Sequence, residues 1–166
     1  MTVEDLATSP EAVAEAFLAA GRTLMGMSIA SVGAARVEVT MVQFRTLVLL
    51  ADEGERTVGE IGAELGVNAS NATRHCDRLQ KIGLLRRRRS TTDGRVVRVA
   101  LTTDGRRLVD EVKAQRRAEV LQVLERMPLR DQVGAVHALT AFNRAAHEHG
   151  GGEWVAPQEV RPPARP

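Results

Sequence analysis

The sequence predicts a mainly α-helical fold with one two-stranded β-hairpin, and three observations support this class. Apolar residues recur at spacings of three and four over most of the 166 residues, which is the period of amphipathic helices. Ser, Thr and Asn residues stand before these segments, where their side chains can accept hydrogen bonds from free backbone amides. Between residues 84 and 101 the pattern changes to two short runs around a polar turn, which is typical of a hairpin.

The first predicted helix is long and begins at Ser9-Pro10, an N-cap followed by a first-turn proline. It is expected to end near residues 33–36. Two shorter helices follow, and each begins with a capping box, Thr40-x-x-Gln43 and Thr57-x-x-Glu60, in which the two side chains satisfy backbone amides reciprocally. The sequence therefore places two capped helices close together.

Asn68 is the expected N-cap of the next helix, which should stop at Gly83. Its two faces differ in character. Small and apolar residues follow one line at helical spacing, while polar and basic residues follow another. We expect the first line to pack and the second to project into solvent; the projecting residues are Asn71, Arg74, Arg78 and Lys81.

Strands are expected over residues 84–89 and 95–101, joined by the turn at residues 90–94. Thr102 can cap a further helix that Pro128 ends, and residues 129–149 form a last amphipathic helix. Gly150-Gly151-Gly152 and the proline-rich end predict a disordered tail over residues 150–166.

Charge is distributed unevenly along the chain, although the net charge is only +2. Residues 1–67 carry 4 Arg against 10 Asp/Glu, whereas residues 68–107 carry 11 Lys/Arg against 3 Asp/Glu. A positive block of this kind suggests a polyanionic partner. One Trp, three Phe and no Tyr argue against stacking on single strands, which leaves duplex DNA as a candidate partner.

Two helices, a polar-faced helix and a basic hairpin make a winged helix-turn-helix, in which the third helix enters the major groove and the hairpin reaches the flanking backbone or minor groove. Asn and Arg side chains can read base edges there, and hydroxyls near the helix start can donate to phosphates. Alternate arginines of a strand face opposite ways, so only some of the run at residues 86–89 should contact DNA. The candidate DNA-binding residues are Asn68, Ser70, Asn71, Thr73, Arg74, Arg78, Lys81, Arg86, Arg88 and Arg95.

The sequence resembles the multiple-antibiotic-resistance regulator (MarR) family of bacterial transcription factors in element order over roughly residues 10–149. The resemblance is carried by the segments at residues 40–44, 57–67, 73–79, 83–87, 93–95 and 101–105, which include Thr57-Val58-Gly59-Glu60-Ile61 and Asp93-Gly94-Arg95. It implies a homodimer that binds a pseudo-palindromic operator, commonly as a repressor. Arg95 matches the wing-tip arginine of the minor groove, and Asp93 matches the acidic residue that orients the wing.

The resemblance also implies four regions: an N-terminal dimerisation helix (1–36), a DNA-binding lobe (37–103), C-terminal dimerisation helices (104–149) and the tail (150–166). A small-molecule effector in a crevice between lobe and dimerisation helices is common in the family. The candidate lining residues, for which an ordinary core role is the favoured alternative, are Phe17, Leu24, Met25, Met27, Met41 and Phe44.

Other functions find little support in the sequence. No catalytic motif stands out, no cofactor is implied, and the single Cys and four His lack metal-ligand spacing, so we expect no enzyme and no metal site. Cys76 could be an oxidation sensor, but a buried inert thiol is favoured because it shares a line with Ala72 and Leu79. No segment is expected to cross a membrane, which predicts a cytoplasmic protein. A winged-helix module that docks an acidic protein partner remains the alternative, although its helix would need no stripe of Asn and Arg.

Overall fold

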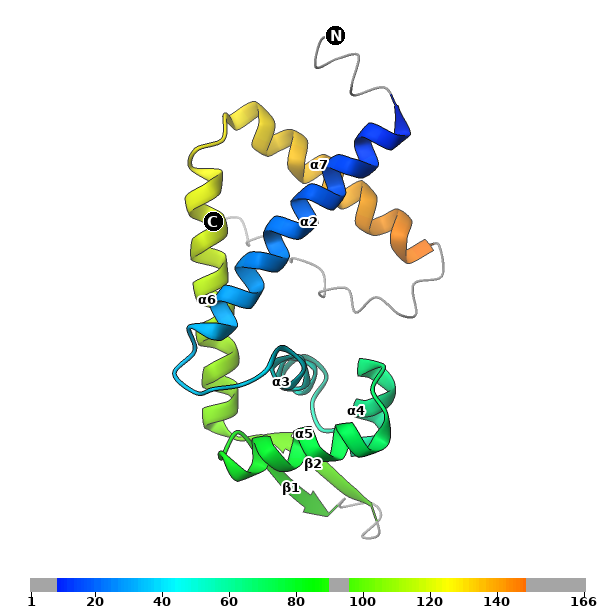
Figure 1. The fold of residues 1–166 in the computed structure, drawn as a ribbon, viewed down its shortest axis with the longest axis vertical. Helices are drawn as coiled ribbons and strands as arrows, with labels where there is room; N and C mark the ends of the chain where they lie inside the picture. The colour runs from blue at the N-terminus through cyan, green and yellow to red at the C-terminus, as the bar shows by residue number, and fades with distance from the viewer. Residues whose placement is uncertain (1–8, 90–95, 149–166) are drawn as a thin grey trace, which may run out of the picture. The chain divides into compact units, whose positions relative to one another are not determined.

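The computed structural model describes residues 9–89 and 96–148. The chain divides into two compact units, residues 1–120 and 121–166. In the first unit the described elements are α2 (Pro10–Gly33), α3 (Met41–Glu53), α4 (Val58–Leu65), α5 (Ala69–Lys81), β1 (Leu85–Arg89), β2 (Val97–Leu101) and most of α6 (Thr103–Leu124) (Figure 1). The second unit contains the end of α6 and α7 (Leu129–Glu148).

Local capping determines where the helices begin. Ser9 caps α2 and accepts a hydrogen bond from the Ala12 amide at 3.1 Å. Thr40 and Thr57 form complete capping boxes with Gln43 and Glu60, as the sequence predicts. The predicted fold class, a mainly α-helical winged helix-turn-helix, is confirmed.

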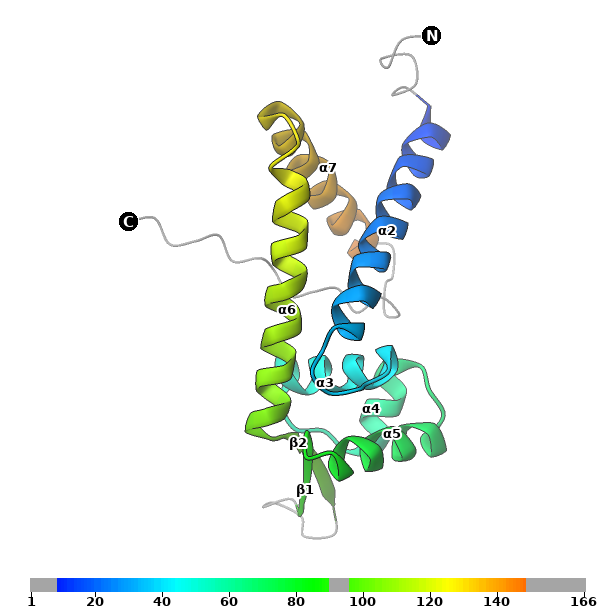
Figure 2. The same ribbon diagram turned by 60° about the vertical axis from the view of Figure 1, so that its left-hand side comes forward.

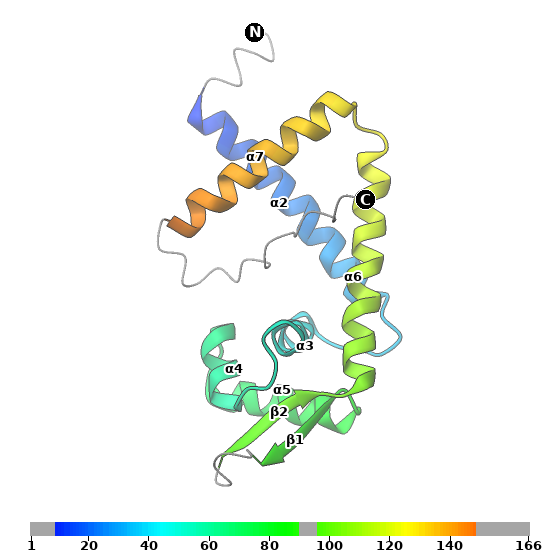
Figure 3. The same cartoon turned by 180° about the vertical axis from the view of Figure 1, so that it is seen from behind.

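The wing is an antiparallel pair in which Leu85 lies opposite Leu101 and Arg89 lies opposite Val97 (Figure 3). A short bridge between Arg56 and Val99 attaches the loop before α4 to the free side of β2. The turn expected at residues 90–94, together with Arg95, lies outside the described residues.

The hydrophobic core lies within the first unit and joins α3, α4, α5, the hairpin and the first half of α6. Leu47 and Leu79 are fully buried, as is Val109 on α6. Leu108 and Val112 belong to the same cluster, so the first half of α6 packs into the lobe. Figure 2 shows α6 starting directly from the end of β2.

Two further contacts attach α6 to the end of α3. The Arg106 guanidinium donates to the Ala51 carbonyl at 2.8 Å, and the Lys113 ammonium lies 2.9 Å from the Asp52 carboxylate. Cations near the carboxyl end of a helix are favourable because the helix dipole is negative there. The direction of α6 is therefore tied to that of α3.

Helix α2 presents an apolar surface to solvent. Leu18, Met25 and Ile29 are each more than half exposed. Among the described residues, α2 is long and apolar enough to cross a membrane by length and composition alone, a test that helices of soluble proteins also pass. A helix whose apolar residues await a protein partner has the same composition.

Candidate nucleic-acid interface

The first turn of α5 is ordered by its N-cap. The Asn68 side-chain oxygen accepts hydrogen bonds from the Asn71 amide at 2.8 Å and from the Ser70 hydroxyl at 2.9 Å. The Thr73 hydroxyl donates to the Ala69 carbonyl at 2.9 Å. Each of these side chains is engaged within its own helix, so in this conformation Asn68 acts by shaping the helix start.

Helix α5 separates into the two faces that the sequence predicts. Ala72, Cys76 and Leu79 are almost fully buried, whereas Arg74 and Arg78 are exposed. The Arg74 guanidinium donates to the Asn71 side-chain oxygen at 2.8 Å, which joins two of the candidate base-reading residues. Lys81 is also exposed, near the end of the same helix.

Two neighbouring arginines of β1 pair with carboxylates on opposite sides of the strand. Arg87 meets Asp77 of α5 at 2.5 Å, and Arg88 meets Glu55 of the loop between α3 and α4 at 2.6 Å. Successive side chains of a strand point to opposite faces. The wing stem is therefore held to the recognition helix on one face and to the α3–α4 loop on the other.

The structure thus separates the arginines of the wing by role. Arg86 is exposed. Arg88, a candidate DNA-binding residue, has its guanidinium occupied by Glu55. The candidates Arg95 and Asp93 lie outside the described residues. Sequence reasoning missed Glu55 and Asp77 as partners of these arginines. The one signal in the sequence was the run of four arginines itself, because like charges this close together call for neutralising carboxylates.

The link between wing and α6 is too tight for a side chain. A Cβ placed on Gly105 would lie 2.2 Å from the Leu84 carbonyl oxygen. Thr102 donates two hydrogen bonds to the segment before β1: its amide donates to the Leu84 carbonyl at 3.1 Å, and its hydroxyl donates to the Gly83 carbonyl at 2.7 Å. Gly83 ends the recognition helix with φ +79, a conformation that favours glycine. The end of α5 and the start of α6 are thereby fixed against each other.

Cys76 lies on the buried face of α5. Cys76 is 1% exposed, and burial raises the pKa of its thiol. A high pKa leaves little reactive thiolate, which agrees with the buried-thiol interpretation. Among residues 9–89 and 96–148, no group of three His, Cys, Asp or Glu side chains could hold a metal ion.

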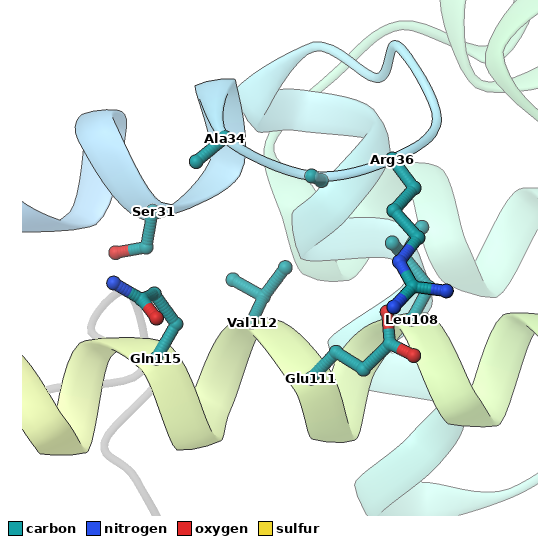
Figure 4. A pocket seen from close by; sticks show the side chains of 8 residues that line it. Ser31, Ala34, Arg36, Leu108, Glu111, Val112 and Gln115 are labelled. Atoms are coloured by element: carbon teal, nitrogen blue, oxygen red, sulfur yellow. The ribbon is translucent and has the colours of Figure 1, made fainter.

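A shallow cavity of about 280 Å³ lies between the end of α2 and the first half of α6 (Figure 4). Its lining combines apolar side chains with polar ones. The apolar lining residues are Ala34, Ala35, Leu108 and Val112, and the polar ones are Ser31, Arg36, Glu111 and Gln115. None of the six residues expected to line an effector site borders it. Of those six, Phe44 is buried in the core and Met41 packs against it, Phe17 and Met27 are half-buried, and Leu24 and Met25 are exposed.

Comparison with known proteins agrees with this geometry. The sequence model of the MarR family matches residues 39–97. The chain is 32% identical over 108 residues to the HTH-type transcriptional repressor MdtR of Bacillus subtilis. The aligned region covers 65% of this chain and 70% of MdtR.

Solved structures extend the likeness over most of the chain. RV1404 from Mycobacterium tuberculosis is 36% identical with a TM-score of 0.78, and the match covers 86% of this chain and 95% of RV1404. Streptococcus pneumoniae FabT, crystallised in complex with DNA, is 19% identical with a TM-score of 0.69, and the match covers 84% of this chain and 99% of FabT. At that identity the likeness to FabT concerns the fold alone.

Proposed function

The chain belongs to the MarR family of transcriptional regulators, and we propose that it is a cytoplasmic repressor that binds a pseudo-palindromic operator as a homodimer. The observation that carries this proposal is the exposed polar face of α5 beside the basic hairpin, while Cys76 and Leu79 on the other face of this helix belong to the core. Helix α5 is the element that enters the major groove, and the hairpin contacts the flanking backbone.

Within this proposal some residues of α5 contact base edges and others contact phosphates. Arg74 and Arg78 read base edges, because an arginine can donate two parallel hydrogen bonds to guanine. Asn71 lies between them and the helix start. On binding DNA, the Ser70 and Thr73 hydroxyls turn from their partners within the helix to phosphates. Lys81 and the free amides of the first turn of α5 contact phosphates as well.

The wing adds contacts outside the major groove. Arg86 meets the phosphate backbone, and Arg95 enters the minor groove, where a narrow groove concentrates negative potential. Asp93 holds the wing arginines in position and does not itself contact DNA. The roles of Arg95 and Asp93 follow from the family resemblance.

Dimerisation is supported by apolar surface in each unit. On α2, Leu18, Met25 and Ile29 are 57%, 58% and 58% exposed. On α7, Val136 and Leu129 are 62% and 75% exposed. Contiguous apolar surface of this kind marks a site of association, and an isologous dimer would cover it in both subunits while presenting two copies of α5. Repression then follows if the operator overlaps a promoter, and MdtR is a repressor by name.

Release from DNA by a small-molecule effector is a further part of the proposal. The cavity lies between α2, which carries the exposed apolar surface, and α6, which packs into the lobe. A ligand that changes the separation of these helices would change the spacing of the two recognition helices in a dimer. Its mixed lining suits a small amphipathic molecule.

A mobility-shift assay tests the central claim. The probe is the promoter region of the protein's own gene, and a duplex of the same length and scrambled sequence is the control. We expect a discrete complex that the scrambled duplex does not displace. Absence of any preference, with retention instead on an acidic protein surface, would favour a protein-docking module.

A further inference from the structure

The wing arginine Arg88 is held by both oxygens of a single carboxylate, that of Glu55. Its Nε donates to Glu55 Oε2 at 2.8 Å, and its Nη2 lies 2.6 Å from Glu55 Oε1. The Glu55 side chain is only 26% exposed, against 52% for Arg88. Parallel contacts of this kind fix the plane of the guanidinium as well as its position.

Glu55 is itself fixed to the wing through its backbone. The next residue, Arg56, exchanges two backbone hydrogen bonds with Val99 of β2, at 3.2 and 2.7 Å. The Glu55 carbonyl accepts from the guanidinium of Arg98 at 3.4 Å and of Arg56 at 3.1 Å. The loop between α3 and α4 is therefore joined to β2 by a single antiparallel bridge at Arg56, and the Glu55 carboxylate is paired with Arg88.

This position matters because Arg88 and Arg98 lie directly opposite each other in the hairpin. Like charges that face each other across two strands repel and would favour turning one side chain outward. Glu55 counters this repulsion with its carboxylate on Arg88 and its carbonyl on Arg98. A Glu60 oxygen lies 3.9 Å from Arg98 and adds a weaker attraction.

We propose that Glu55 is a specificity-determining residue that keeps Arg88 from binding DNA phosphates. This inference rests on the proposed function. A phosphate contact strengthens binding to every sequence, whereas base contacts strengthen binding to the operator alone. Pairing Arg88 within the protein removes one sequence-independent contact from each subunit, and a phosphate that approached Arg88 would also meet the Glu55 carboxylate.

The test compares Glu55→Gln with Glu53→Gln. Glu53 lies at the end of α3 beside the same loop and pairs with Arg56 at 3.0 Å, so its substitution removes the same charge and one ion pair but releases no arginine of the wing strands. The probes are a duplex selected by the wild-type chain from a random library and a mixed random-sequence duplex of the same length. Affinities for both are measured by fluorescence anisotropy over a range of salt concentrations.

For Glu55→Gln we expect tighter binding to the random duplex and a smaller preference for the selected duplex. The slope of log affinity against log salt on the random duplex should steepen by about 0.9 for each subunit in which Arg88 reaches a phosphate. Glu53→Gln should change this slope much less. Equal slopes for the two variants would overturn the proposal.

Arg88→Gln provides an independent decision. In the wild-type background it should leave the salt slope unchanged, because Arg88 is already occupied, and in the Glu55→Gln background it should remove the added slope. A lower slope for Arg88→Gln alone would mean that Arg88 contacts phosphates in the native protein and would overturn the proposal.

Controls on folding and on the premise complete the design. Ion pairs with partly exposed members contribute little to folding, so melting temperatures should stay close to wild type; if Glu55→Gln fails to fold, Arg88→Gln in the wild-type background decides alone. A wild-type chain that binds no duplex at all would overturn the proposed function and this inference with it. A wild-type chain that selects a duplex while Glu55→Gln matches its control would overturn the inference only.

Discussion

Substitution of Gly105 by alanine should destabilise the protein, because the added methyl group meets a fixed backbone carbonyl. Its Cβ would lie 2.2 Å from the Leu84 oxygen and 3.0 Å from Leu101 Cδ2. Real Cβ atoms essentially never approach a neighbour within 3.0 Å, so the Leu84 carbonyl must move by at least about 0.8 Å. That movement also strains the hydrogen bond that this carbonyl accepts from the Thr102 amide.

The expected cost follows from these two effects. Overpacking of a tight site costs ~1–3 kcal/mol, and weakening a backbone hydrogen bond costs up to ~1 kcal/mol. Replacing glycine by alanine in a helix returns ~0.4–1 kcal/mol where the site is compatible. The free energy of unfolding should therefore fall by about 2 kcal/mol, which corresponds to a melting temperature lower by about 4–8 °C for a chain of this size.

The assay is urea and thermal unfolding followed by circular dichroism, with Gly59→Ala as the matched control. Gly59 lies in the first turn of α4, as Gly105 does in α6, but its added Cβ would meet nothing closer than 4.0 Å. Gly59→Ala should be neutral or slightly stabilising. If Gly105→Ala unfolded at the same urea concentration as Gly59→Ala, the tight junction between wing and α6 would be refuted.

Four further predictions follow from the same structure. Arg74→Ala should weaken operator binding by ~1–3 kcal/mol and flatten the preference at one base position, and Asn71→Ala should flatten the same position more weakly, as binding to base-substituted duplexes would reveal; unchanged preference in both would contradict the assignment. Sedimentation should give about twice 18.0 kDa, and a stable micromolar monomer would contradict dimerisation. Hydrogen bonds from the Thr57 amide and hydroxyl lower the pKa of Glu60. The ionised Glu60 carboxylate therefore stabilises the fold above its unfolded pKa, and this stabilisation is lost as the pH falls through its folded pKa. The melting temperature of Glu60→Gln should fall less than that of the wild type between these two pKa values, and parallel curves of melting temperature against pH would contradict the prediction. Arg95→Ala should weaken binding and lower the salt slope by about 0.9 for each lost phosphate contact, whereas an unchanged slope would place Arg95 away from DNA.

Helix starts could be predicted from the sequence because they depend on side chains three residues apart. Thr40 with Gln43 and Thr57 with Glu60 close their hydrogen bonds within a single turn, so no tertiary information is needed. The two faces of α5 could also be predicted, because 3.6-residue periodicity places Cys76 and Arg74 on different sides whatever surrounds the helix.

The role of α6 was harder to predict because its pattern has two meanings. Leu108 and Val112 belong to one continuous apolar series on the helix, and a series of this kind fits a dimer seam or a domain core equally well. The structure buries these two in the lobe, while Leu121 and Val123 of the same helix are 48% and 44% exposed. The close approach of Gly105 to Leu84, which joins residues 21 positions apart, and the contacts of Arg106 and Lys113 with the end of α3 hold the first half of α6 against the lobe.

The roles of the arginines in the wing also depend on contacts far apart in the sequence. Four successive arginines look equivalent, and strand alternation separates them into two pairs without telling which side meets DNA. The partners that decide this are Asp77, ten residues before Arg87, and Glu55, 33 residues before Arg88. A basic run therefore predicts a polyanionic partner for the segment as a whole, while each guanidinium is assigned only once the carboxylates folded against it are known. On this argument the DNA-facing charge of the wing stem is smaller than its composition suggests, and the difference is the quantity that the salt slopes of Arg88→Gln and Glu55→Gln measure.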